Sequence, residues 1–197
     1  LFVPDTIPFV NFEEIGKLSE MNYRERAKYI LGRFLTDFTS EEIEACVNSA
    51  YTKEKFGTDS IAPVYKLNNS SYILELWHGP TCAFKDMALQ IMPRLFVRAV
   101  RKCGEDRTAL ILVATSGDTG KAALEGYKDI DGVKIIIFYP VDGVSTVQKL
   151  QMATQTGNNV AVRAIHGNFD DAQTGVKTLF ADETLAKELN DCGVFLS

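Results

Sequence analysis

The sequence predicts an α/β protein in which an amino-terminal region of helices and a small sheet precedes a domain built on a parallel sheet. From residue 108 onward, short runs rich in β-branched residues alternate with amphipathic helical segments. Such continuous apolar strands are typical of a parallel sheet covered on both faces through right-handed crossovers. A polar run separates this pattern from the helical periodicity before it. We therefore predict domains at residues 1–105 and 106–197, with the boundary near Glu105 and Asp106.

The amino-terminal region carries start and stop signals for its elements. Residues 1–18 contain two prolines, so we expect this segment to be irregular. Thr39, followed three residues later by Glu42, fits a capping box at the start of a helix that ends at Gly57. Pro93 either kinks the last helix of the region or marks its start. The expected elements are helices at 22–38, 40–56 and 87–102 and a hairpin of strands at 64–67 and 72–76.

The second domain shows a repeated strand-then-helix pattern. The expected strands are 109–114, 133–139, 160–165 and 194–196. The expected helices are 119–127, 146–156 and 170–189, the last of which leaves room for a break. This order predicts parallel strands joined by helices.

Composition limits the classes of partner. A net charge of −5 argues against a nucleic-acid partner, which favours a basic surface. The longest apolar run is only of strand length, so we expect no membrane partner, and the first residues lack a secretory signal. The four cysteines are scattered without a C-x-x-C pair, and only two histidines accompany them. We therefore expect free thiols, a cytoplasmic protein and no metal site.

A lysine stands near the start of the helix that follows the hairpin. The chain passes from the second strand through Gly79 and Pro80 to Lys85. The positive end of a helix makes the neutral amine of a lysine easier to reach, and neutral amines form Schiff bases. Lys85 is therefore a candidate covalent anchor for an aldehyde cofactor or carbonyl substrate, although these features alone favour an ordinary surface lysine. We expect Cys82 to be buried as a small apolar side chain.

A second candidate site follows the first parallel strand and opens a helix, where α/β sheets bind ligands. Its residues are Thr115, Ser116, Gly117, Asp118, Thr119 and Gly120. The glycines permit close ligand approach, and the helix amino-terminus offers unpaired N–H groups to an anion. An N-capped turn explains the segment equally well. A nucleotide phosphate loop does not, because the glycine spacing is too short and Ala122 stands where Ser or Thr must hold magnesium.

A third polar segment follows the strand at 160–165 and precedes a helix. It reads Gly167-Asn168-Phe169-Asp170-Asp171. We interpret it as structural, because a helix cap by Asn168 or Asp170 explains it fully.

Together these segments resemble the threonine synthases, a family of pyridoxal-phosphate enzymes of fold type II with the tryptophan synthase β-like fold. The resemblance rests on His78-Gly79-Pro80-Thr81 with Ala83-Phe84-Lys85-Asp86, on the segment from Thr115 to Gly120, and on Gly167 to Asp171. The three come in the family's order and at roughly its separations. The resemblance implies a lyase that converts O-phospho-L-homoserine and water to L-threonine and phosphate by γ-elimination and β-addition. The implied cofactor is pyridoxal 5′-phosphate.

The resemblance also implies roles for the candidate residues. Lys85 anchors the cofactor and acts as general acid and base, and Asp118 approaches the cofactor ring where many relatives in the wider fold type carry Asn. The segment from Thr115 to Gly120 binds the substrate.

In this family the loop for the cofactor phosphate lies further along than Ser197. The chain therefore looks like the amino-terminal half of such an enzyme, and we expect it to be inactive alone. Two alternatives stay open: a related phospholyase acting on another phosphorylated hydroxy-amino acid, and a non-catalytic α/β binding module. The intact Lys85 and the intact segment from Ser116 to Gly120 weigh against the second alternative.

Overall fold

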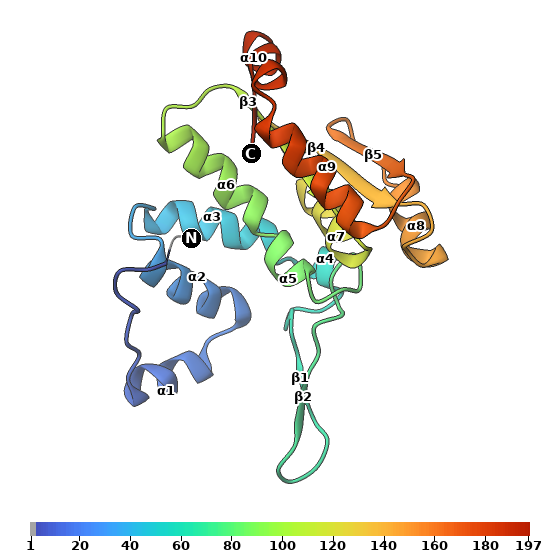
Figure 1. The fold of residues 1–197 in the computed structure, drawn as a ribbon. Coiled ribbons are helices and arrows are strands. Elements are labelled where there is room, and N and C mark those ends of the chain that lie inside the picture. Colours follow the sequence, from blue (N-terminus) through green and yellow to red (C-terminus); the bar gives the residue numbers. More distant parts are fainter. Residues whose placement is uncertain (1–2) are drawn as a thin grey trace. The chain divides into compact units, whose positions relative to one another are not determined.

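The computed structural model describes residues 3–197, which divide into two compact units (Figure 1). The first unit ends at Gly79 and the second begins at Pro80. Within this part of the chain, no helix is both long enough and apolar enough to cross a membrane.

The division between the units lies earlier than the domain boundary predicted near Glu105. Two helices that precede this residue, α5 (Asp86–Leu89) and α6 (Met92–Lys102), pack against α7 (Asp118–Tyr127) of the second unit. These contacts join them to the sheet that follows, although a polar run separates them from it in sequence. The division at residue 105 stays a prediction about the domains of the whole protein.

Four helices of the first unit begin with side-chain caps. They are α1 (Phe12–Glu20), α2 (Tyr23–Phe34), α3 (Ser40–Ala50) and α4 (Lys53–Phe56). Helix α1 shows that the prediction of an irregular segment through residue 18 was wrong. Asn11 and Glu14 form a capping box there, so the helix starts despite the two prolines before it.

The helix predicted to run from Thr39 to Gly57 is divided into α3 and α4. The predicted capping box at Thr39 and Glu42 is confirmed, and Gly57 ends α4 in the left-handed conformation, with φ 67°. Between the two helices, the Thr52 side chain accepts a hydrogen bond from the Lys55 N–H. This bond caps a new helix start at Thr52. The first helix therefore ends before Thr52 and does not continue into α4.

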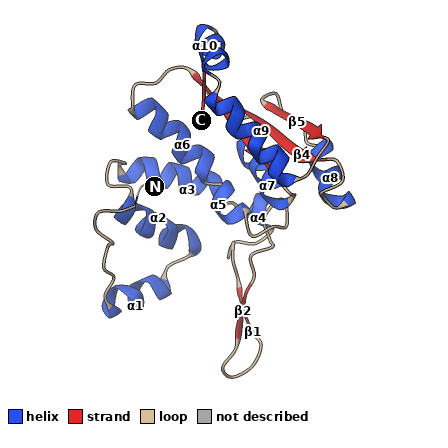
Figure 2. Ribbon diagram, viewed as in Figure 1, coloured by secondary structure: helices blue, strands red, loops and turns tan. Residues whose placement is uncertain are grey.

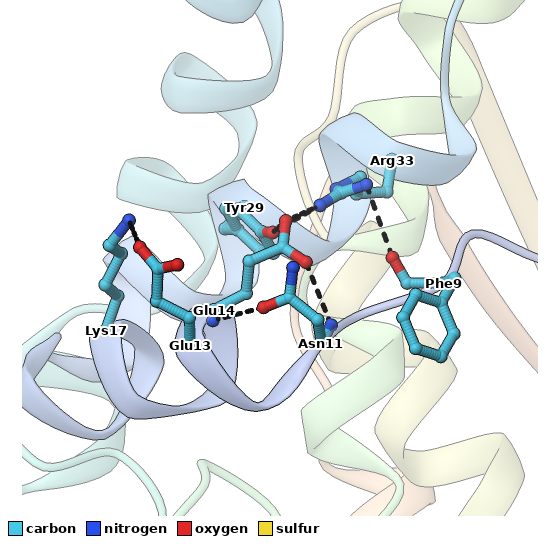
Figure 3. Close-up of polar contacts among 7 residues, drawn as sticks. All are labelled: Phe9, Asn11, Glu13, Glu14, Lys17, Tyr29 and Arg33. Carbon is cyan, nitrogen blue, oxygen red and sulfur yellow. Dashed lines mark hydrogen bonds and ion pairs between the residues drawn. The ribbon is translucent and has the colours of Figure 1, made fainter.

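Polar side chains join α1 to α2 (Figure 3). The Glu14 carboxylate accepts a hydrogen bond from the Tyr29 hydroxyl at 2.6 Å and pairs with the Arg33 guanidinium. Arg33 also donates to the Tyr29 hydroxyl at 2.5 Å and to the Phe9 carbonyl at 3.5 Å. The hydrogen bond from Tyr29 is the main cause that lowers the pKa of Glu14. One carboxylate therefore both completes a capping box and connects two helices.

The predicted hairpin is confirmed, with shorter strands. Strands β1 (Val64–Lys66) and β2 (Tyr72–Leu74) pair antiparallel. In the turn, the Asn68 side chain accepts two backbone N–H groups at 3.0 and 2.9 Å, which is a common use of Asn in turns. Large apolar side chains of both strands are exposed, among them Tyr72 at 61%.

The second unit is built on a four-stranded sheet with strand order β5-β4-β3-β6. Figure 2 draws the strands in red, with β4 beside β5. The strands are β3 (Thr108–Ala114), β4 (Val133–Pro140), β5 (Val160–Ile165) and β6 (Val194–Leu196). All three pairings are parallel, so the predicted sheet is confirmed, and each strand lies within one residue of its predicted bounds.

The helices of this unit are close to their predicted positions, with two breaks. Besides α5, α6 and α7 they are α8 (Thr146–Ala153), α9 (Phe169–Ala181) and α10 (Glu183–Asp191). Asp182 separates α9 from α10, and its side chain accepts two N–H groups of the second helix at 2.9 and 3.0 Å. Pro93 lies in the first turn of α6, so it marks a helix start, one of the two roles considered for it.

The core of the second unit lies between the sheet and its helices. Its fully buried large side chains include Leu124, Tyr127, Ile135, Ile137 and Met152. At the edge of this core, the Asn159 amide donates to three backbone carbonyls, of Tyr127, Ile130 and Val133, at 2.8, 3.2 and 3.0 Å. Asn159 also accepts the Asp129 N–H at 2.7 Å, so one side chain holds the turn that leads into β4.

The strand order identifies a ligand-binding edge of the sheet. The chain runs from β3 to β4 and β5 in one direction and then returns to place β6 on the other side of β3. In open α/β sheets, ligands bind beyond the carboxyl ends of the strands where the order reverses in this way. The residues that directly follow β3 are Thr115–Gly120, which we call the glycine loop.

Candidate active site

Lys85 carries a free amine. It is half-buried and lies directly before α5, with helical backbone angles of φ −58° and ψ −26°. Its Nζ lies 4.8 Å from the centre of the Phe84 ring. Among the described residues, this amine forms no hydrogen bond or ion pair, and its charged form would be stabilised by the Phe84 ring alone.

The helix that follows Lys85 is shorter than the sequence predicted. Helix α5 has four residues, and the chain starts a new helix before Pro93. Because the dipoles of aligned peptide units add along a helix, α5 provides a weaker positive end than a continuous helix over 87–102. The dipole argument for an accessible amine is therefore weaker than expected.

The turn before Lys85 is held by a buried acid. Asp86 is 0% exposed, and its two carboxylate oxygens accept hydrogen bonds from the Thr81 N–H and hydroxyl, both at 2.8 Å. Burial raises the pKa of Asp86, and the bonds from Thr81 oppose this shift. Inside the turn, Cys82 has φ 59°, a left-handed conformation that costs a residue other than glycine about 1–3 kcal/mol. Its side chain is exposed, so the prediction that Cys82 is buried was wrong.

A buried threonine shapes the glycine loop. The Thr115 hydroxyl accepts the N–H groups of Gly117 and Gly120 at 3.0 and 2.9 Å, and Thr115 is only 2% exposed. A Cβ at Gly120 would lie 2.4 Å from the Thr115 side chain, so only glycine fits there. Thr115 and the two glycines thus form the inside of the loop, whereas Ser116, Asp118 and Thr119 are exposed.

The exposed acidic residue of the glycine loop, Asp118, is held by a side chain from the neighbouring strand–helix unit. The Gln148 amide in α8 donates to Asp118 at 2.8 Å and accepts the Ser145 N–H at 3.2 Å. It also covers Gly117, where an added Cβ would lie 2.4 Å from the amide nitrogen. Gly117 has φ 147°, which favours glycine. The sequence analysis missed Gln148, although its capping-box spacing from Ser145 was a detectable signal.

The two candidate segments belong to one unit and are linked through their helices. Helix α5, which follows Lys85, packs against α7, which begins at the glycine loop. A Cβ at Gly126 would lie 2.0 Å from the Leu89 carbonyl oxygen, so the two helices approach each other at backbone distance. No described hydrogen bond joins Lys85 itself to the loop.

The remaining motif residues have local partners. Asn168 caps α9 and accepts the N–H groups of Asp170 and Asp171 at 2.8 and 3.0 Å, which confirms the structural interpretation. In the first unit, His78 Nε2 lies 2.6 Å from a carboxylate oxygen of Glu75. The sequence analysis did not predict this contact, nor the one between Thr81 and Asp86.

Comparisons with known proteins point to one family. A family model for the threonine synthase N terminus matches residues 1–51. The threonine synthase of Pseudomonas aeruginosa is 41% identical over 188 residues, covering 95% of this chain and 39% of that protein. The structure of pyridoxal-phosphate-bound threonine synthase from Brucella melitensis is 36% identical with a TM-score of 0.85, covering 99% of this chain and 41% of that one. The yeast enzyme is 30% identical with a TM-score of 0.86, covering 100% and 40%.

With solved structures this similar along the whole chain, the fold is that of the fold-type II pyridoxal-phosphate enzymes. Within that class, the chain corresponds to the amino-terminal part of the threonine synthases, as the sequence motifs indicated. It spans about two-fifths of the length of these relatives.

Proposed function

We propose that the whole protein is a threonine synthase, which uses pyridoxal phosphate to convert O-phospho-L-homoserine and water to L-threonine and phosphate. The observation that carries this proposal is the Lys85 amine, half-buried and without a described polar partner directly before α5. The similarity to threonine synthases of known structure supports it.

The surroundings of Lys85 fit a covalently held aldehyde cofactor. No described carboxylate pairs with the Lys85 amine, so it is available to form the Schiff base through its neutral form, which is the form that attacks a carbonyl. Pyridoxal phosphate, when bound, supplies an electron sink for negative charge that develops on the substrate. We place the cradle for the cofactor phosphate in the part of the whole protein beyond Ser197. This chain alone should therefore bind the cofactor poorly and be inactive.

Different residues of this chain transfer protons, bind the substrate and shape the glycine loop. The Lys85 amine moves protons at the α and β carbons of the substrate, which allows phosphate to leave from the γ carbon and water to add at the β carbon. The Asp118 and Thr119 N–H groups, the first two of α7, have no acceptor within the helix and bind the substrate carboxylate, whereas the Gly120 N–H is already bonded to Thr115. Ser116 and Thr119 orient the substrate, and Asp118 is one of the residues that would hold the cofactor. Thr115, Gly117 and Gly120 keep the glycine loop in shape.

The proposal also covers domain movement, partners and cellular compartment. Residues 106–197 act as a mobile substrate-binding domain, whose closure excludes water from the early steps. The partner is the small-molecule substrate, and neither nucleic acid nor membrane takes part. The protein works in the cytoplasm, where its cysteine thiols would stay reduced.

The test is an assay of the full-length protein with O-phosphohomoserine that follows phosphate and threonine together. We expect equal release of both, and loss of both in Lys85→Ala. Lys85→Arg is the matched control, because it keeps the positive charge but cannot form the covalent link, and it should be equally inactive. Phosphate with a keto acid and no threonine would instead establish the phospholyase. A folded, cofactor-loaded protein that releases neither product would contradict both enzyme assignments.

A further inference from the structure

Beside the lysine of the proposed site lies a buried carboxylate for which the described residues provide no cationic partner. Asp86 is 0% exposed, and its side chain accepts two hydrogen bonds from Thr81, which is itself 6% exposed, with the Ala83 backbone as a weaker partner. Burying a carboxylate is unfavourable unless its hydrogen bonds are satisfied. The like charge of Glu125 adds to the effect of burial. The burial of the Asp86 carboxylate therefore calls for a structural or functional explanation.

Helix capping does not explain the burial of Asp86. Asp86 is the first residue of α5, where an acid ordinarily interacts with the free N–H groups of the helix. Its oxygens instead point back along the chain to Thr81, five residues earlier. These two bonds close the turn 82–85 at both ends. Lys85 is the last residue inside this closed turn.

The turn itself is strained. Cys82 adopts a left-handed conformation with φ 59°, although it carries a side chain. Such conformations persist only where the surrounding structure enforces them, and they cluster at functional sites. The pair of bonds between Thr81 and Asp86 spans this residue and enforces its conformation. Without them, the turn could relax and Lys85 would leave its present direction.

We propose that Thr81 and Asp86 form a clamp that positions Lys85 for its covalent reaction with the carbonyl cofactor. Both are positioning residues, since they act through the lysine rather than by touching the substrate. This inference rests on the proposed function of Lys85. Because the clamp acts on the lysine, its loss should slow attachment of the cofactor and turnover, while the KM for the substrate changes little.

The test uses the full-length protein and two substitutions at one position. Thr81→Val has the same shape but lacks the hydroxyl, whereas Thr81→Ser keeps it. The cofactor-free protein is mixed with pyridoxal phosphate, samples are reduced with borohydride at intervals, and the labelled Lys85 peptide is measured by mass spectrometry. Thr178→Val is the matched control, because it removes a hydroxyl that donates to the Thr174 carbonyl at 3.0 Å in α9.

We expect Thr81→Val to slow labelling of Lys85 and to lower kcat by about tenfold, since small misplacements of a reacting group have large effects on rate. Thr81→Ser should restore both to within about threefold, and Thr178→Val should match the wild type. If Thr81→Val does not fold, Asp86→Asn, which keeps the shape but disturbs the same two bonds, provides the same comparison.

The outcomes separate the two proposals. Labelling at the wild-type rate in both Thr81→Val and Asp86→Asn would overturn the clamp and leave the proposed function intact. Slow labelling that Thr81→Ser does not restore, with an equally lowered unfolding temperature, would also overturn it, because a merely structural role explains that result. A wild-type protein that is not labelled at Lys85 at all would overturn the proposed function together with the clamp.

Discussion

The backbone contact between α5 and α7 predicts that one substitution has opposite effects in two helices. Gly126 in α7 and Gly175 in α9 both lie inside helices. An added Cβ at Gly126 would lie 2.0 Å from the Leu89 carbonyl oxygen, whereas at Gly175 it would meet nothing within 4 Å. Alanine should therefore destabilise the protein at the first site and stabilise it at the second.

The magnitudes follow from the geometry. A carbon and a carbonyl oxygen in contact lie about 3.3 Å apart, so α5 must retreat by about 1 Å in Gly126→Ala. Overpacking of this kind costs up to about 3 kcal/mol, and the better helix propensity of alanine returns about 1 kcal/mol. We expect a net loss of about 2 kcal/mol. Gly175→Ala should gain about 0.5–1 kcal/mol, because only the propensity changes.

Activity gives a second readout, because α5 follows Lys85 directly. A shift of about 1 Å in a reacting group can reduce the rate about a hundredfold, so Gly126→Ala should lose most of its turnover while Gly175→Ala retains it. Urea unfolding of the cofactor-free full-length protein measures the first effect, and threonine release measures the second. If Gly126→Ala matches Gly175→Ala in both assays, α5 and α7 do not approach each other as described, and the reasoning is refuted.

Three further predictions use other features. Asn159→Ala should lower the free energy of unfolding by about 2–4 kcal/mol, since three carbonyls lose their donor; Asn158→Ala, which leaves those bonds in place, should change it little in the same urea experiment. The exposed hairpin should make the isolated 197-residue chain bind an apolar dye, and Tyr72→Lys should reduce that fluorescence; equal binding would contradict the hairpin as its source. Hydrogen bonds from Arg107 lower the pKa of Glu105 to about 2. Its contribution to stability is thus complete above the ordinary carboxyl pKa and is lost as the pH falls toward about 2, so Glu105→Gln should flatten the unfolding profile in that range.

Much of the fold follows from local signals. Strands 160–165 and 194–196 were predicted with the bounds they have, because short, mainly apolar runs next to glycine and asparagine are typical of strands. The helix at Asn11 was missed although it carries the same capping box as Thr39. The two nearby prolines had led us to expect an irregular segment in spite of that capping box. At Thr52, one cap divided a helix whose apolar pattern looked continuous.

The candidate site was predictable only in part. Lys85 and the glycine loop stand in motifs, so the sequence locates them. The burial of Asp86 depends on which elements pack over it, and the bond from Gln148 to Asp118 depends on two strand–helix units being neighbours. The exposure of Cys82 follows from its backbone conformation. None of these properties is encoded in a short stretch of sequence.

The capping boxes have a consequence for how the chain folds. At Asn11, Asn22, Thr39, Ser145 and Asn168 they link residues only three positions apart. Such contacts form with little loop-closure entropy, so these helix starts can form while the protein is still being synthesised. Strand β6 is different, because it pairs with β3 only after all the intervening units have been made. Until then one edge of β3 stays open, and an open edge favours pairing with another chain. The slow arrival of β6 is therefore the interval in which this protein is most exposed to aggregation.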